Sequence, residues 1–175
     1  MKASKQSLWG ALAGLVVVVL AGVLAWNAFA RDPKAPAVDF HLLDGSTLST
    51  AQLRGKVVLV EFWATSCTTC VGEMPRMVRM YNDFAPKGFN LVAVAMSYDN
   101  PAYVHNFAAA GPDGRLPFPV AFDASGSVAR AFDRVRLTPT SFLIDKSGHI
   151  VKQYVGPPDM PQLQALIGRL LRQQA

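Results

Sequence analysis

The chain has 175 residues, enough for one globular domain with a buried core and too few for two domains of ordinary size. Its formal net charge is +5, but from residue 31 onward it carries 15 basic and 12 acidic residues, so the remainder is only mildly basic. No block of Lys and Arg interleaved with aromatic residues occurs, and the composition therefore argues against a nucleic-acid-binding protein.

Residues 8–30 form an apolar stretch without a charged side chain, preceded by Lys2 and Lys5. About 20 apolar residues suffice for a helix to cross the hydrocarbon layer. The basic flank favours retention in the cytoplasm, which would place the rest of the chain outside. A cleaved signal peptide is the alternative, because residues 28–30 (Ala-Phe-Ala) fit the small-x-small pattern before a cleavage site. We expect an uncleaved membrane anchor over residues 1–30, since the apolar run is longer than an ordinary signal core.

Residues 31–37 (RDPKAPA) contain two prolines and three charges, a composition typical of a short, stiff tether. We therefore predict that a single domain occupies residues 38–175. Whether the N-terminal segment is retained as an anchor or cleaved as a signal peptide, we expect the domain to be exported. Disulfides persist in compartments outside the cytoplasm.

The predicted domain alternates between strands and helices. Two apolar, β-branched runs are typical of buried strands, and between them apolar residues recur at helical spacing. A second helix, a short strand, a short helix, a hairpin around Lys146-Ser147-Gly148 and a C-terminal helix follow. The predicted fold is an α/β domain with a mixed central sheet and helices on both faces. The predicted segments, in chain order, are 56–62, a helix after residue 67, 90–96, 101–110, 118–123, 127–132, the hairpin and the terminal helix.

Both cysteines of the chain lie in the stretch FWATSCTTCVGEMP. Cys67 falls between a buried strand and a helix, where free backbone N–H groups and the helix dipole favour a thiolate. Such a sulfur attacks in thiol-disulfide exchange, and Cys70, one helical turn later, can then displace it from a mixed disulfide. The spacing therefore predicts a redox couple.

Two other roles for the cysteines were weighed. A zinc site needs four ligands, and the three histidines of the chain are far apart in sequence and form no second close-spaced pair. A structural disulfide across so short a loop removes little entropy from the unfolded chain. Both alternatives fit the sequence less well than redox chemistry.

The segments LVEFWATSCTTCVGEMP and RVRLTPTSFLIDKSGHIV, in this order, resemble the thioredoxin superfamily, and specifically its membrane-anchored TlpA/ResA/CcmG-like thiol-disulfide oxidoreductases. The resemblance implies a thioredoxin-like fold preceded by one transmembrane helix. It also implies that Cys67 is the exposed nucleophile and Cys70 the buried partner. Pro139 matches the family's cis-proline, which would let the backbone around Thr138 bind a client chain as an added strand.

Three further residues match supporting positions of the family. Glu61 occupies the position of a buried acid, whose raised pKa would suit proton exchange with Cys70. Glu73 matches an acidic position of ResA-like members, and Trp63 matches an aromatic residue before the motif. The simpler interpretation of both glutamates is that they point to water.

The sequence departs from thioredoxin next to the cysteines. Ser66 stands where thioredoxin has Trp, and Thr68-Thr69 matches neither the Gly-Pro of strong reductants nor the Pro-His of strong oxidants. We expect Ser66, Thr68 and Thr69, with Thr138 and Pro139, to contact the client and to determine which client is bound.

The resemblance predicts an enzyme that reduces disulfides of exported proteins, of the kind serving cytochrome c maturation or copper-site assembly. Its expected partners are a disulfide-bearing client and a membrane thiol reductase as electron donor, with no cofactor besides the Cys67–Cys70 disulfide. The expected location is the bacterial inner membrane, crossed once, with the catalytic domain in the periplasm. The alternative is a metallochaperone that holds Cu(I) between the two cysteines.

Overall fold

The computed structural model describes residues 14–20, 22, 33–111 and 114–173, which divide into a unit Met1–Asp32 and a globular unit Pro33–Ala175. The described residues of the first unit are helical. Most of the membrane segment predicted for residues 8–30 lies outside the described residues. Within the described part of the chain, no helix combines the length and apolarity needed to cross a membrane.

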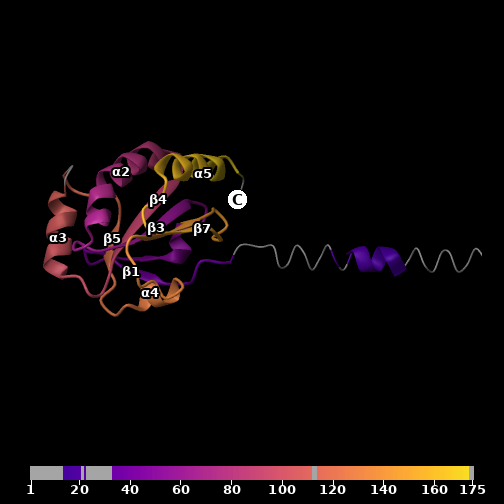
Figure 1. Cartoon of the computed structure of the whole chain (residues 1–175), viewed down its shortest axis with the longest axis horizontal. Helices are drawn as coiled ribbons and strands as arrows, with labels where there is room; N and C mark the ends of the chain where they lie inside the picture. Colours follow the sequence, from indigo (N-terminus) through magenta and orange to yellow (C-terminus); the bar gives the residue numbers. More distant parts are fainter. Residues whose placement is uncertain (1–13, 21, 23–32, 112–113, 174–175) are drawn as a thin grey trace, which may run out of the picture. The chain divides into compact units, whose positions relative to one another are not determined.

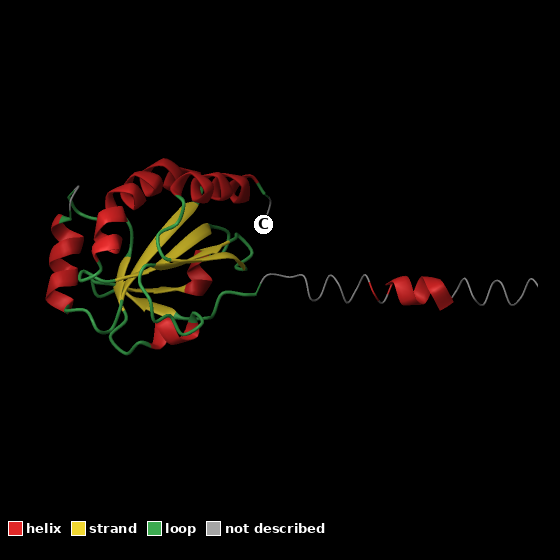
Figure 2. Cartoon of the chain, viewed as in Figure 1, coloured by secondary structure: helices red, strands yellow, loops and turns green. Residues whose placement is uncertain are grey.

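The globular unit is built around a five-stranded mixed sheet of order β5-β4-β3-β6-β7 (Figures 1 and 2). The central strand β3 pairs in parallel with β4 and antiparallel with β6, so it has a neighbour on both edges. All seven of its residues are buried, as its continuous apolar sequence predicts. The strands are β3 (Val57–Trp63), β4 (Phe89–Ala95), β5 (Val120–Phe122), β6 (Thr140–Ile144) and β7 (Ile150–Val155).

Helices cover both faces of this sheet. In Figure 1, α2 and α5 lie above the strands, α4 lies below them and α3 lies at the left-hand side. The predicted α/β architecture is thereby confirmed. The helices are α2 (Thr68–Phe84), α3 (Pro101–Ala110), α4 (Ser127–Ala131) and α5 (Met160–Arg172), with the 3-10 turns η1 (Thr50–Leu53) and η2 (Ala85–Lys87).

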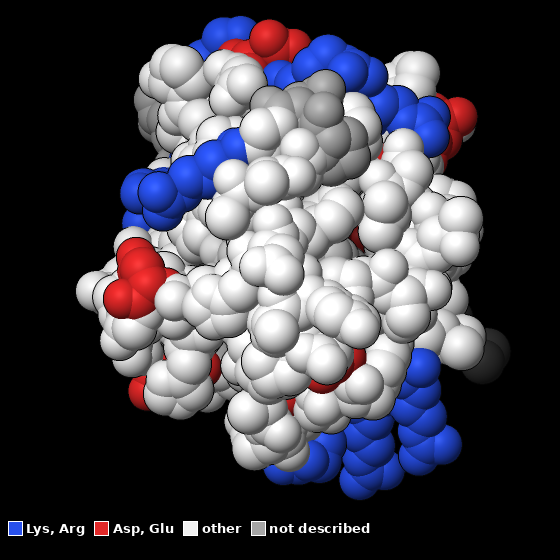
Figure 3. Space-filling view, turned by 90° about the vertical axis from the view of Figure 1, so that its left-hand side faces the viewer, with Lys and Arg blue, Asp and Glu red and all other residues white. Residues whose placement is uncertain are grey.

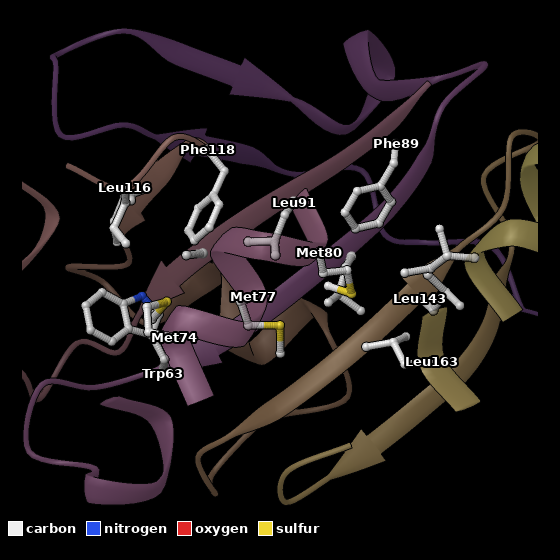
Figure 4. Packing of buried hydrophobic residues seen from close by; sticks show 14 of the residues in the cluster. Trp63, Met74, Met77, Met80, Phe89, Leu91, Leu116, Phe118, Leu143 and Leu163 are labelled. Carbon is white, nitrogen blue, oxygen red and sulfur yellow. The ribbon is translucent and has the colours of Figure 1, made fainter. Parts of the chain in front are cut away.

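Two apolar cores form because successive residues of β3 point to opposite faces of the sheet. Leu59 and Trp63 face the core under α2 and α5, where Met74 and Met77 of α2 pack (Figure 4). Phe62 faces the opposite core, formed with α4 and with the N-terminal part of the domain. Glu61 belongs by alternation to the α2 side, although it is the only acid in the strand.

Two features at the start of the globular unit go beyond what the sequence patterns predict. A small antiparallel hairpin, β1 (Asp39–His41) with β2 (Thr47–Ser49), precedes the main sheet and was not anticipated. The globular unit begins at Pro33, inside the segment expected to form a tether. The Pro33 carbonyl accepts a hydrogen bond from Ile150 N–H (2.8 Å), and Ala35 N–H donates to the Gly148 carbonyl (2.9 Å). Backbone pairing with the β6–β7 hairpin therefore holds part of the predicted tether.

Candidate active site

The two cysteines lie where the central strand ends and α2 begins. Cys67 is the N-cap of α2, and its Sγ accepts a hydrogen bond from Cys70 N–H at 3.2 Å. The sulfurs of Cys67 and Cys70 form a disulfide. Cys67 is half-buried, whereas Cys70 is 1 % exposed. The pair is therefore asymmetric: a reagent in solution reaches the first sulfur more easily than the second.

Asp99 fixes the loop that leads into the cysteines. Its carboxylate accepts hydrogen bonds from Thr65 N–H (2.6 Å) and Thr65 Oγ1 (2.7 Å), and from Asn100 N–H (2.9 Å). Asp99 follows β4 and is itself buried, so it ties the end of one parallel strand to the loop after its neighbour. No motif in the sequence marks Asp99 as a functional residue. The only sign of its role in the sequence is that an acidic residue lies four positions after a buried strand.

The Thr138–Pro139 loop lies at the same end of the sheet. The peptide bond between these residues is cis. Thr140, which starts β6, pairs with Phe62 near the end of β3, so the loop before it borders the segment that carries Cys67. Thr140 Oγ1 donates to the Leu137 carbonyl at 2.8 Å and closes the loop. Gly156 N–H donates to the Pro139 carbonyl at 2.8 Å, which ties the loop to β7.

Exposed apolar side chains gather around this loop. Tyr98 shares a hydrogen bond with Thr138, with 3.3 Å between the hydroxyl oxygens, and is 59 % exposed. Leu137 precedes Thr138 in the chain and Val155 pairs with Thr140; each is 65 % exposed. Figure 3 views the side of the globular unit where α3 lies, and charged groups are sparse across its middle. Such a surface suits an apolar polypeptide segment.

Ser66, Thr68 and Thr69 are all exposed next to Cys67. Small hydroxyl side chains therefore surround the attacking sulfur on the solvent side. The structure brings them to the end of the sheet that also carries the Thr138–Pro139 loop. These positions are compatible with the client contacts expected from the sequence.

A buried polar cluster formed by Glu61, Glu73 and Ser141 begins one helical turn after Cys70. Glu61 on β3 is 2 % exposed and Glu73, one turn after Cys70 on α2, is 3 % exposed. Ser141 pairs with Glu61 across β3 and β6 and is fully buried. Among the described residues, both oxygens of Glu61, Oε1 of Glu73 and Oγ of Ser141 have no hydrogen-bond partner within bonding geometry. The interpretation that these glutamates point to water does not hold.

Burial is the largest cause that raises the pKa of Glu61 well above its ordinary value, and the charge of Glu73 acts in the same direction. Burial also raises the pKa of Glu73, while its side-chain contact with Glu61 and, to a smaller extent, the charge of Arg76 oppose this increase. Two carboxyl groups in one apolar site resist carrying two negative charges. Ionisation of both carboxyl groups at once is therefore disfavoured.

Trp63 packs inside the same core and is fully buried. Its ring lies 5.2 Å from the ring of Phe107, which comes from α3. Figure 4 shows the indole beside Met74 of α2. Trp63 thus packs α2 and α3 against the strand that carries Glu61. Because its side chain is fully buried, it offers no surface for contact with a client.

Two cavities of the globular unit lie apart from the cysteines and the buried acids. One of about 730 Å³ is bordered by the β1–β2 turn, α3 and the start of β5, and neither cysteine nor either glutamate lines it. Within the described residues, no group of three or more His, Cys, Asp or Glu side chains is arranged to hold a metal ion.

We predict that Asp99→Ala lowers the free energy of unfolding by about 1–3 kcal/mol, because the Thr65 N–H loses its acceptor in a partly buried place. Urea unfolding monitored by tryptophan fluorescence measures this change. Asp39→Ala, at an exposed strand position, is the control. Equal stabilities of the two variants would show that Asp99 does not hold the loop.

We also predict that Glu61→Gln weakens the pH dependence of stability. The raised pKa means that the folded state binds more protons than the unfolded chain above the ordinary value of 4.5. The wild-type free energy of unfolding therefore falls as pH rises from there through the pKa of the folded state. Unfolding curves between pH 4 and 9 test this, with exposed Asp83→Asn as the control. An unchanged slope in Glu61→Gln would contradict the assignment.

Comparison with known proteins agrees with this geometry. Residues 30–167 match the Redoxin family model. The chain is 32 % identical over 149 residues to the thiol-disulfide oxidoreductase ResA of Bacillus subtilis, covering 81 % of this chain and 80 % of ResA. A candidate thioredoxin of Neisseria meningitidis, solved in solution, is 42 % identical with a TM-score of 0.73, covering 82 % of this chain and 93 % of that one.

A thioredoxin-family thiol:disulfide interchange protein of Chlorobium tepidum is 31 % identical with a TM-score of 0.72, covering 81 % of this chain and 98 % of that one. The chain therefore belongs to the Redoxin family and is a TlpA/ResA-like thiol-disulfide oxidoreductase of the thioredoxin superfamily.

Proposed function

We propose that this oxidoreductase acts as a reductase of disulfides in exported proteins. The observation that carries the direction is the pair of buried acids under Cys70. Negative charge near a sulfur disfavours its thiolate. A reduced form that is poorly stabilised gives a low potential, whereas strong oxidants have a stabilised reduced form. Among the described residues, no Lys, Arg or His side chain hydrogen-bonds to either sulfur. No cation in contact with a sulfur therefore counteracts the effect of the acids.

The reaction begins with attack by the Cys67 thiolate on a client disulfide. A mixed disulfide forms, and the first client sulfur leaves and takes up a proton. Cys70 then gives its proton to the carboxylate cluster and attacks the Cys67 sulfur. The Cys67–Cys70 disulfide seen in the structure forms, and the second client thiol is released. Two electrons pass from the enzyme dithiol to the client.

Client binding is assigned to the surface around the Thr138–Pro139 loop. The exposed side chains of Tyr98 and Leu137 provide an apolar contact area, and the backbone of the loop is placed to pair with an extended segment. Ser66, Thr68 and Thr69 lie on the solvent side of Cys67 and contact the residues that flank the client cysteine.

The proposed location is the bacterial inner membrane. The apolar sequence of residues 8–30 and the preceding lysines support an uncleaved anchor with the catalytic domain in the periplasm. A membrane thiol reductase would then return the enzyme to its dithiol form. The proposed clients are of the cytochrome c maturation or copper-site assembly type, which rests on the resemblance to TlpA/ResA/CcmG-like proteins.

We predict a reduction potential below about −200 mV, in the range of glutaredoxins and thioredoxin. Equilibration of the full chain in detergent with thiol buffers of known potential, followed by quenched alkylation of Cys67, measures it. Glu61→Gln paired with Glu73→Gln should raise the potential, because the acids no longer oppose the thiolate. A wild-type value near the roughly −120 mV of DsbA would refute the reductase direction.

A further inference from the structure

The buried cluster contains a residue to which the chemistry above gives no part. Ser141 is fully buried in β6, and its hydroxyl makes no hydrogen bond of good geometry among the described residues, although its nearness to Glu61 lowers the pKa of that acid. An unpaired hydroxyl in a core costs free energy, so such a group calls for a physical explanation. Apolar Phe142 and Leu143 follow it in the same strand, which shows that the strand itself does not require a polar residue.

The sheet places Ser141 directly opposite Glu61. Residues that face each other across antiparallel strands point to the same face, with their Cβ atoms about 4.5–5.5 Å apart. Both oxygens of Glu61 are also unpaired. A hydroxyl that can rotate and a carboxyl group that gains and loses a proton therefore lie side by side in the same apolar site.

We propose that Ser141 is a positioning residue for proton transfer: its hydroxyl group donates a hydrogen bond to the Glu61 carboxylate whenever that group is ionised. This proposal rests on the function proposed above. Ionised Glu61 is the acceptor for the proton of Cys70, so Ser141 stabilises the form of Glu61 that must be present before Cys70 attacks. When Cys70 has given up its proton, Glu61 is protonated and no longer needs the donor.

Other groups around Glu61 do not fill this role. From α2, the contact between the two acids raises the pKa of Glu61 and lowers the pKa of Glu73, so Glu73 is the acceptor in that contact and not the donor. Cys70 is the thiol whose proton is to be transferred. From β4, the facing residue is Ala93, which has no polar side chain. Tyr154 of β7 pairs with Ser141 and not with Glu61. Arg76 acts on Glu73 from the exposed side of α2.

The test isolates the step in which Cys70 attacks. Reduced full-length protein in detergent is mixed with dithiobis(nitrobenzoate), which forms a mixed disulfide with Cys67 and releases one coloured thiolate. Attack by Cys70 then releases the second thiolate, and stopped-flow absorbance gives its rate. The rate is measured from pH 4 to 9, so that its midpoint reports on the acceptor of the Cys70 proton.

The matched pair Ser141→Thr and Ser141→Val differs by a hydroxyl against a methyl group at nearly constant shape. We expect Ser141→Thr to keep the wild-type profile. Ser141→Val should move the midpoint upward by about one pH unit and slow resolution about tenfold below the midpoint, the lower limit for losing a hydrogen bond to a charged group. In a Glu61→Gln background, the same two variants should have superimposable profiles.

The outcomes separate this inference from the proposed function. If wild-type protein never releases the second thiolate, the assignment of Cys70 as resolving cysteine fails and the inference fails with it. If resolution is normal but Ser141→Val keeps the wild-type midpoint, or is slower by the same factor at every pH, only the role of Ser141 is overturned. A midpoint shift that persists in the Glu61→Gln background would likewise overturn it.

Discussion

One physical constraint shapes the site: the carboxyl group of Glu61 is shielded from water. Glu61 lies in the central strand of the sheet, between strands on both edges and beneath α2, in a place built for apolar side chains. A carboxylate in such a site loses its hydration, and a second acid, Glu73, adds like charge where a cation would have offset it. Burying these two acids costs free energy, and we propose that the arrangement serves the transfer of a proton from Cys70.

The position of β3 explains why Glu61, the disulfide and the Thr138–Pro139 loop come together. The strand ends at Trp63, and the chain turns through four residues, the last of which is Cys67, into the helix that carries Cys70. β4 contributes Asp99, which holds that turn, and β6 begins with the residue that follows the cis-proline loop. Half-buried Cys67 thus lies at the end of the sheet near the Thr138–Pro139 loop, while Cys70 is buried one helical turn before Glu73.

Much of this could be predicted from local sequence. The apolar run that became β3 and the Cys-x-x-Cys after it predict the junction and its redox role, because a buried strand and a helix each leave a periodic pattern. The exact helix 101–110 was also predictable, since Asn100 and Pro101 mark its start and Gly111 its end. The strands β1 and β2, of three residues each, left no such pattern because half their side chains are exposed.

The residues that sequence reasoning missed act through partners distant in the chain. Asp99 contacts Thr65, Tyr98 contacts Thr138 and Ser141 faces Glu61, and each pairing exists only once the sheet has formed. Likewise, residues 33–35 have the composition of a tether, but their backbone groups find partners on the β6–β7 hairpin. Composition reports what a segment favours alone and not what a neighbouring element offers.

The central claim is that the two sulfurs have different tasks, with Cys67 attacking and Cys70 protected. Limited alkylation of the fully reduced chain with iodoacetamide, followed by peptide mass spectrometry, tests it most directly. The account predicts that Cys67 is modified first near neutral pH, below the pKa of about 8.5 of a free thiol, while Cys70 stays unmodified. Equal modification of both sulfurs, or reaction of Cys67 only above that pH, would contradict it.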